Sequence, residues 1–456
     1  MNGRKHEVGA EPESDGVEEA LALLGPQSRQ EHTPTGNRPT APDTGGHRAT
    51  AWPAARALAA RIGRSAPART RKVPLEQAVG QVLAEPLTAL CDLPSFDTSA
   101  MDGWAVAGPG PWRVHGDGSV LAGRDDAPEL EDGSAVRIAT GARIPAEATA
   151  VIRTEHARTD ADGRLLHAER AVTQGQDIRP RGQECRSGDQ LLPTGSLVSP
   201  AVLGLAAAAG YDELLTVPRP RVEILVLGDE LLTEGLPHDG LIRDALGPMV
   251  GPWLRALGVE VVATRALGDD ADALHRAVTT SDADLVITTG GTAAGPVDHV
   301  HPVLRKVGAE LLVDGVAVRP GHPMLLAALP PGKNVPVRHL VGLPGNPLAA
   351  VSGLLTLAEP LLRGLAGTAA TAGYLAPVRD EVHGHPYDTR LVPFVHRGEE
   401  LVPLHYNGPA MLRGIAAADG LAVVPPGGAR PGDELEVLDL PWTPGTPSTV
   451  DGGCFT

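Results

Sequence analysis

The sequence predicts a multidomain α/β plus β protein, and three observations support this fold class. At 456 residues the chain is too long for one ordinary core, and about three domains are expected. A buried strand, a polar Gly-rich loop and a helix follow one another three times between residues 222 and 365. Short β segments broken by Gly and Pro precede and follow this region, which predicts β-rich lobes on either side.

The N-terminal part is expected to pass from disorder to helices. Residues 1–50 are rich in Pro, Gly, Thr and acids without sustained periodicity, so we expect a disordered leader. Residues 54–62 have helical spacing. Residues 73–84 place apolar side chains at i, i+3, i+4 and i+7, which predicts an amphipathic helix.

Residues 86–200 carry the first β-rich region. Its short apolar runs include 134–138 and 150–153, and both are flanked by turn residues. A helix of small residues is expected at 201–210.

The middle of the chain predicts a parallel sheet. Residues 222–227, 284–289 and 340–343 read as buried strands, with helices around 248–257 and up to about 365. Open parallel sheets bind ligands at the carboxyl ends of their strands, so the three polar loops that follow these strands should converge on one pocket. Residues 372–442 return to short strands, which suggests a small β-barrel or sandwich.

Composition excludes several classes of protein. The formal net charge of -17 argues against a nucleic-acid-binding surface. Three widely spaced cysteines lack metal-ligand spacing and fit a reducing compartment. No apolar run is expected to approach the length of a membrane-spanning helix, and the start lacks a signal-peptide pattern, so we expect a cytoplasmic protein.

The segment 96–106 is the first candidate site. Asp97 and Asp102 bracket small hydroxyl residues, Ser99 among them, and Gly103 allows polar groups to crowd round a phosphate or a hydroxyl-rich ligand. Thr140 lies on a later turn that Asp102 could also reach. The alternative is a capped turn in which an Asp only accepts backbone hydrogen bonds.

The loop that begins at Gly290 and Gly291 has a phosphate-cradle pattern, because glycines let backbone N–H groups approach an oxyanion. A tight strand-to-helix turn is the alternative. Asp298, Asp229 and Glu230 would then lie beside phosphates, and carboxylates there require a hard cation such as Mg²⁺. For the last two acids, helix N-terminal capping is the alternative.

A cationic loop supplies the opposite charge. Arg319 can bind two oxyanion oxygens, and His322 can donate or titrate near neutrality, within a segment held by two prolines and a glycine. A plain loop histidine is the alternative for His322. Arg181 and Glu184 belong to a second polar loop at 179–184, where solvated charge is equally plausible.

Seven segments, in order and spacing, resemble the molybdopterin molybdenumtransferases, the family of MoeA and the gephyrin E-domain. The resemblance covers roughly residues 70–442. The matching segments are 96–106, 137–145, 179–184, 228–231, 290–298, 319–323 and 342–347.

This resemblance implies four lobes per chain in a homodimer. Residues 51–95 and 166–200 would form an N-terminal linker lobe, and 96–165 a β-rich lobe. Residues 201–369 would form a three-layer α/β molybdopterin-binding domain and 370–442 a β-barrel, before a flexible tail at 443–456. The family site lies at the dimer cleft, so its two halves would come from different subunits. Other proteins of molybdenum cofactor biosynthesis are further candidate partners.

The resemblance also implies the reaction. Adenylylated molybdopterin binds, AMP is released by hydrolysis, and the two dithiolene sulphurs take up molybdate with the assistance of Mg²⁺. The predicted catalytic residues are Asp102, Thr140, Asp229, Asp298 and Arg319. The predicted metal ligands are Asp229, Glu230, Asp244 and Asp298. The predicted cofactor-binding residues are Ser99, Arg181, Glu184, Gly290, Gly291, Thr292, Gly295, His322, Gly345 and Asn346.

The chain departs from the family pattern at several positions, which are Gln183, Leu227, Ala245, Leu246, Ala293, Arg319 and His322. Hydroxyls are lost and two lysines are replaced, which should alter phosphate binding. Two hypotheses therefore compete: an active molybdenumtransferase, or a non-catalytic paralogue that binds molybdopterin. A different enzyme on the same α/β fold is a third reading, but the flanking β lobes argue against it.

Overall fold

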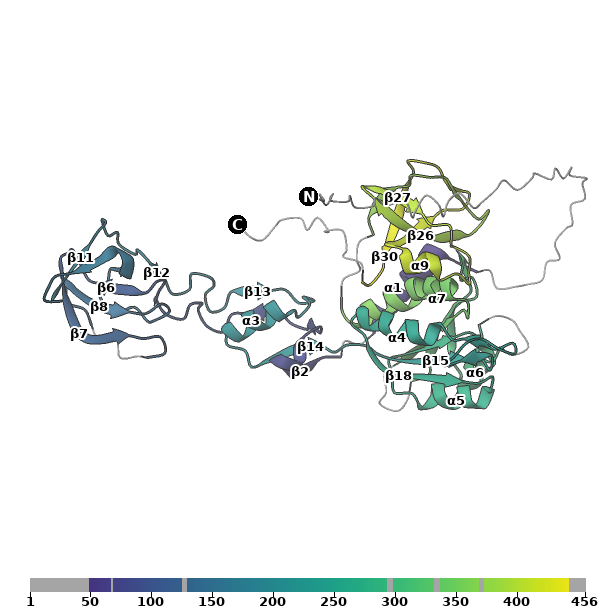
Figure 1. Ribbon diagram of the computed structural model, residues 1–456. Coiled ribbons are helices and arrows are strands. Elements are labelled where there is room, and N and C mark those ends of the chain that lie inside the picture. The colour runs from purple at the N-terminus through teal and green to yellow at the C-terminus, as the bar shows by residue number, and fades with distance from the viewer. Residues whose placement is uncertain are drawn as a thin grey trace, which may run out of the picture. The chain divides into compact units, whose positions relative to one another are not determined.

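The computed structural model describes residues 49–66, 69–124, 129–292, 298–331, 337–368 and 373–442 (Figure 1). The tail at 443–456 and all but the last two residues of the predicted leader lie outside the described residues, as do Ala293 and Gly295.

The α/β domain is built on a six-stranded sheet of order β18-β15-β19-β23-β22-β20. The first four of these are parallel, as predicted, whereas β22 pairs antiparallel with β23 and β20 pairs antiparallel with β22. The strands are β15 (Arg221–Leu227), β18 (Glu260–Leu267), β19 (Leu285–Thr289), β20 (Glu310–Asp314), β22 (Leu325–Leu329) and β23 (Arg338–Leu343).

Helices cover both faces of this sheet, so the domain has the three layers that were expected (Figure 1). The helices α5 (Ala271–Thr280) and α6 (Val300–Val307) pack on one face with Leu225, whereas α4 (Leu246–Ala256) packs on the other with Ile224. Neighbouring strand residues point to opposite faces, and both faces are buried, which explains the continuous apolar runs in the sequence.

A long apolar helical run completes the second face. It consists of α7 (Pro347–Gly353), the π-helical turn η2 (Leu354–Ala358) and α8 (Glu359–Leu365). This run of 19 residues, with a hydropathy of 1.3, is long and apolar enough to cross a membrane. The expectation that no such run exists is therefore wrong. However, 83% of the most apolar 18-residue window of this run is buried in the domain, as expected of a core helix that is apolar on all sides.

Helix α1 (Trp52–Ser65), predicted at 54–62, crosses α8 at two glycines. A Cβ on Gly63 would lie 2.2 Å from the Leu361 carbonyl oxygen, and one on Gly364 would lie 2.6 Å from the Arg64 nitrogen. The two backbones are therefore in direct contact. In addition, the Trp52 indole N–H donates to the Thr356 hydroxyl at 2.9 Å, within the π-helical turn.

A second lobe joins residues from both ends of the first β-rich region. Its strands are β2 (Arg71–Pro74), β3 (Val82–Leu83), β4 (Leu87–Thr88), β13 (Gln190–Leu192) and β14 (Glu213–Val217), and its helices are α2 (Leu75–Ala78) and α3 (Pro200–Ala208). The predicted helix over 73–84 is thus reduced to one turn. Gly80 has a φ of 75°, which ends the helix, and Val82 pairs with β14 instead.

The boundary of the α/β domain follows from these contacts. It was predicted at residue 201, but β14 pairs with β2 and the α3 residue Ala206 packs beside Val73, so we propose that the α/β domain begins after β14. We propose that residues 218–220 connect the two domains. Two prolines in this segment cannot donate ladder hydrogen bonds, which suits a connection.

The β-rich lobe is a six-stranded sheet of order β10-β11-β7-β8-β6-β9 with apolar residues on both faces. Its strands are β6 (Gly103–Val106), β7 (Trp112–Val120), β8 (Ser134–Ile138), β9 (Ala150–Arg153), β10 (Ala157–Thr159) and β11 (Leu165–Ala168), with the 3-10 turn η1 (Thr154–His156). A short pair, β5 (Thr98–Ser99) and β12 (Ile178–Arg179), adjoins the candidate site.

The C-terminal domain contains the strands β24 (Leu375–Pro377), β25 (Val382–His383), β26 (Thr389–Arg397), β27 (Glu400–Pro403), β28 (Gly420–Val424), β29 (Gly428–Ala429) and β30 (Glu434–Asp439), and the helix α9 (Arg413–Ala417). The strands β27, β26, β28, β30 and β24 pair in that order, and a bridge from Val378 to Leu401 closes the run into the expected small barrel. Strand β21 (Val316–Arg319) pairs with β26 and with β1 (Thr50–Ala51). This pairing fixes Arg319 beside the barrel.

The remaining strands, β16 (Leu231–Leu232) and β17 (Ile242–Arg243), follow β15.

Candidate functional site

The first cluster is an exposed carboxylate–hydroxyl pair in the β-rich lobe. The backbone N–H of Thr140 donates to Asp102 Oδ1 at 2.6 Å and its hydroxyl donates to the same oxygen at 3.0 Å. Hydrogen bonds from this N–H and this hydroxyl lower the pKa of Asp102, so the carboxylate is charged at neutral pH. The predicted proximity of these two residues is confirmed.

Two neighbours hold this pair in place. Gly103 allows β6 to approach β9, because a Cβ on Gly103 would lie 2.0 Å from the Ile152 carbonyl oxygen. Ser99 is fully buried, and its hydroxyl donates to the Met101 carbonyl at 2.6 Å. In the described structure Ser99 therefore supports the turn rather than facing a ligand, in contrast to its predicted role.

The polar loop at 179–184 is held by two aspartates. The Arg181 backbone N–H donates to Asp97 at 2.7 Å, and its guanidinium pairs with Asp92. A hydrogen bond from the Ser187 N–H, together with Arg181, lowers the pKa of Asp92. Glu184 is exposed, and its backbone N–H donates to the Leu93 carbonyl. Asp97 thus has the capping role that was weighed as an alternative for this segment.

The second cluster lies where three parallel strands of the α/β domain end. A Cβ on Gly290 would lie 3.3 Å from the Leu227 carbonyl oxygen, and one on Gly345 would lie 3.7 Å from the Gly290 Cα. The exits of β15, β19 and β23 therefore converge, as expected from their parallel order. Gly290 and Gly291 have positive φ angles of 85° and 66°, which favour glycine. Thr292, by contrast, is buried.

The acids at the β15 exit differ in their surroundings. Asp229 is exposed and lies against Gly268, where a Cβ would be 2.3 Å from its Oδ1. Glu230 is also exposed, and the strand β16 follows it, so neither acid caps a helix. Asp244 caps α4 instead, because its Oδ1 accepts from the N–H groups of Leu246 and Gly247 at 2.9 and 3.0 Å.

Asp298 belongs to a chain of three side chains that the sequence did not reveal. Its Oδ2 lies 3.4 Å from His301 Nδ1, and His301 Nε2 lies 2.9 Å from Asp314 Oδ1. Burial alone would lower the pKa of His301, but the hydrogen bond to Asp314 and the charges of both aspartates raise it overall. The i, i+3 spacing of Asp298 and His301 was the available signal.

A third cluster surrounds a cavity of about 350 Å³ between the loop after β21, the start of α7 and the barrel. Arg319 and Asn346 line it, together with Arg390 and Asn407, which sequence reasoning missed. Arg319 Nε donates to Asp388 at 2.8 Å, and Arg390 Nη2 donates to the Asn407 side-chain oxygen at 3.3 Å. Each guanidinium has further donors for an oxyanion.

His322 lies at the edge of the same cavity but is occupied by the protein itself. Its Nδ1 lies 2.9 Å from the Val316 carbonyl oxygen, so Nδ1 carries a proton and donates. Its Nε2 lies 3.8 Å from the position of a Cβ on Gly315. The ring is thus packed over β21, which matches the alternative reading of a satisfied loop histidine.

The predicted metal ligands do not form a metal cluster. Within the described residues, no three His, Cys, Asp or Glu side chains lie close enough to hold a metal ion. Asp244 and Asp298 already accept hydrogen bonds, which leaves the exposed Asp229 and Glu230 as the acids best able to bind a cation. This arrangement fits Mg²⁺, which commonly uses one or two carboxylates and takes its other ligands from phosphates and water.

The fold and these clusters define a multidomain protein built round a molybdopterin-binding type of α/β domain. Models of three protein-family regions match the chain. They are the MoeA N-terminal region (domain I and II) over residues 52–210, a probable molybdopterin binding domain over 223–364, and the MoeA C-terminal region (domain IV) over 376–440. The chain belongs to the MoeA family.

Individual relatives agree with this assignment. The chain is 34% identical over 400 residues to molybdopterin molybdenumtransferase 2 of Mycobacterium tuberculosis, covering 81% of this chain and 94% of the relative. It is 29% identical over 386 residues to the molybdopterin molybdenumtransferase of Staphylococcus aureus, covering 80% and 90%. The crystal structure of a molybdopterin biosynthesis MoeA protein from Pyrococcus horikoshii matches with a TM-score of 0.69 and 25% identity, covering 86% and 99%.

Proposed function

We propose that this protein is a molybdopterin molybdenumtransferase. It inserts molybdate into adenylylated molybdopterin and releases AMP, late in molybdenum cofactor biosynthesis. The observation that carries this proposal is the cavity lined by Arg319 and Arg390, in a chain that three family regions match. The two relatives described above carry the transferase name, and their matches cover most of this chain.

The cavity suits a small oxyanion. Molybdate is a compact dianion with four oxygens, and two guanidiniums supply both charge and directed donors. Because Arg319 uses only Nε on Asp388, its terminal amino groups retain donors for the anion. The cis peptide bond at Arg319-Pro320 and the left-handed Gly321 define the loop that presents this residue.

The converging strand exits would hold the phosphates of adenylylated molybdopterin. Gly290 and Gly291 keep side chains away from this edge, so backbone N–H groups can approach an oxyanion. In the reaction, water attacks one phosphorus and the phosphoanhydride bond breaks. AMP leaves with one phosphate, and the other stays on molybdopterin. The two dithiol sulphurs of molybdopterin then bind molybdenum, and one molybdate oxygen leaves as water with the two thiol protons.

Asp229 and Asp298 would hold Mg²⁺ in this proposal, with phosphate oxygens as further ligands. The cation would neutralise phosphate charge as the anhydride bond breaks. His301 orients Asp298 from the side, and Asp314 in turn holds His301. In this proposal Glu230 is a neighbouring negative charge, and Asp244 serves as the cap of α4.

Asp102 and Thr140 would complete the site from the second subunit of a homodimer. They lie in a different lobe from the strand exits, and Asp102 is exposed and charged. A charged carboxylate held by a hydroxyl and an N–H can accept a proton from water or orient it. We place the reaction in the cytoplasm, in line with the free thiols of Cys91 and Cys185.

One observation favours the second hypothesis, a molybdopterin-binding paralogue without turnover. His322 packs over β21, and its Nδ1 donates to the Val316 carbonyl rather than to the oxyanion cavity. Arg319 and Arg390 are the arginines that line this cavity.

Release of AMP tests the proposal. Purified protein receives adenylylated molybdopterin, Mg²⁺ and molybdate, and AMP is quantified by chromatography. Release above the protein-free background supports the transferase, whereas molybdopterin binding by calorimetry without AMP release supports the paralogue. Arg390→Ala should raise the half-saturating molybdate concentration about tenfold, because a charge-assisted hydrogen bond is lost. Arg305→Ala, an exposed arginine in α6, is the matched control.

A further inference from the structure

A larger cavity lies at the opposite edge of the α/β sheet, where its parallel strands begin. Its volume is about 850 Å³. The end of α1, the segment before β15, the start of β23 and the end of α8 contribute to its walls. The charged and titratable residues that line it are Arg61, Arg64, Arg69, Arg219, Asp284 and His339. None of them belongs to the strand-exit site or to the oxyanion cavity.

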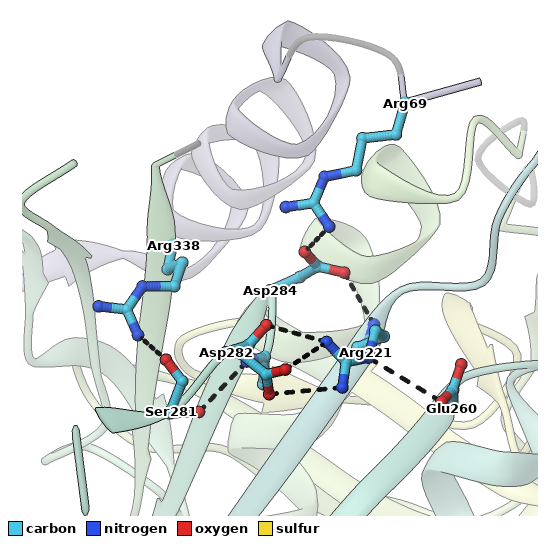
Figure 2. A network of polar contacts seen from close by, with 8 residues as sticks. Arg69, Arg221, Glu260, Ser281, Asp282, Asp284 and Arg338 are labelled. Carbon is cyan, nitrogen blue, oxygen red and sulfur yellow. Dashed lines mark hydrogen bonds and ion pairs between the residues drawn. The ribbon is translucent and has the colours of Figure 1, made fainter. Parts of the chain in front are cut away.

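The carboxylate of this cavity is already neutralised (Figure 2). Asp284 pairs with Arg69, and its Oδ2 accepts from the Arg221 backbone N–H at 2.9 Å. The neighbouring acids on this edge are paired as well, because the Arg221 guanidinium contacts Asp282 at 3.0 Å and Glu260 at 3.9 Å. The acidic groups at this edge therefore do not neutralise the positive charges of the remaining arginines.

Among the arginines that line the cavity, Arg61 and Arg64 have neither an acidic nor a carbonyl partner within the described residues. They lie three residues apart near the end of α1, so their side chains leave the same face of the helix. Both are exposed, and within the described ranges neither side chain makes a hydrogen bond or an ion pair. Arg219 donates one bond, to the Val79 carbonyl at 2.7 Å, and retains other donors. The cavity is therefore locally positive, although the chain as a whole has a formal net charge of -17.

The other walls are apolar or neutral. Ile62, Leu365 and Val337 line the cavity, and Val337 is 47% exposed. His339 is only 4% exposed, its Nδ1 has no partner among the described residues, and burial lowers its pKa, so the ring is neutral. Cationic donors beside an apolar wall are suited to a ligand with an anionic end and an apolar body.

We propose that this cavity binds a small organic phosphate, with its phosphate between Arg61 and Arg64 and its apolar part against Ile62 and Val337. The site is separate from the proposed transferase site, because it lies at the other edge of the sheet. Binding in this cavity does not depend on turnover at the transferase site. A bound ligand would affect the crossing of α1 and α8, because Arg64 directly follows Gly63.

Calorimetric titration of the full-length protein tests this proposal, with inorganic pyrophosphate and AMP as probes. The double variant Arg61→Ala/Arg64→Ala should weaken binding of both at least about tenfold, since two charge-assisted contacts are lost. The double variant Arg276→Ala/Arg305→Ala removes the same charge from exposed positions of α5 and α6 and should leave both affinities unchanged. Added salt should weaken binding.

Further measurements show which site is responsible for any binding of the two probes. Arg319→Ala and saturating molybdate should leave the arginine-dependent binding intact, which distinguishes this cavity from the proposed transferase site. Tighter binding of AMP than of pyrophosphate supports the apolar wall, whereas equal affinity overturns the organic part of the proposal. Unchanged affinity in Arg61→Ala/Arg64→Ala, or no binding of either probe, overturns the site. A change in mass by light scattering in that variant would assign the cavity to a second copy and also overturn it.

Discussion

Replacing Gly63 with alanine should destabilise the α/β domain by about 2 kcal/mol. The new methyl would lie 2.2 Å from the Leu361 carbonyl oxygen, whereas ordinary contact needs roughly 3.4 Å, so α1 and α8 must move apart by roughly 1.2 Å. Backbone atoms cannot turn aside as a side chain can. We therefore take the upper end of the overpacking cost, about 3 kcal/mol, less about 1 kcal/mol gained in helix propensity.

Gly251→Ala is the matched control in α4 of the same domain. Its methyl would lie 3.4 Å from Arg255 Nη1, the end of a flexible side chain, so the helix-propensity gain of up to about 1 kcal/mol should dominate. Scanning calorimetry measures both variants. For a domain of this size, about 2 kcal/mol corresponds to a Tm lower by roughly 4–8 °C. A Gly63→Ala protein as stable as Gly251→Ala would refute the reasoning about the crossing.

Three further predictions concern the candidate site. Asp229→Ala should abolish Mg²⁺-dependent AMP release if this acid holds the cation, and unchanged kinetics would remove it from the mechanism. Thr140→Val should raise the pKa of Asp102, measured by carboxyl carbon NMR, because one of the two hydrogen bonds to Oδ1 is lost; an unmoved pKa would contradict that cause. His301→Gln should cost more stability at pH 6 than at pH 9, by urea unfolding. The pKa of His301 is higher in the folded state than in the unfolded state. The contribution of His301 to stability is therefore complete below its unfolded-state pKa and is lost as the pH rises through its folded-state pKa. An equal cost at both pH values would show that the imidazolium does not contribute.

Local patterns in the sequence predicted part of the α/β domain correctly. The strands β15, β19 and β23 and the helix α4 follow from apolar runs and from the loops between them. The predicted helix at 73–84 failed because periodicity is ambiguous over short segments. There Gly80 breaks the helix, and pairing with β14, more than a hundred residues away, decides the structure.

The candidate site was only partly predictable for a related reason. Asp102 and Thr140 were placed together because a strand and a turn flank each of them. Arg390 and Asn407 gave no such signal, because they come from the barrel and reach the cavity only through the pairing of β21 with β26. The Asp298–His301–Asp314 chain likewise joins a helix to a neighbouring strand.

The sequence by itself determined the family, the parallel sheet and the acids at its strand exits, since these depend on residues that are close in the chain. Only the tertiary structure decided which side chains are free to act. It buried Ser99, turned Asp244 into a helix cap, packed His322 over β21 and left Arg61 and Arg64 unpaired within the described residues. The physical reason is that a polar group can bind a ligand only when distant segments have not already satisfied its hydrogen bonds.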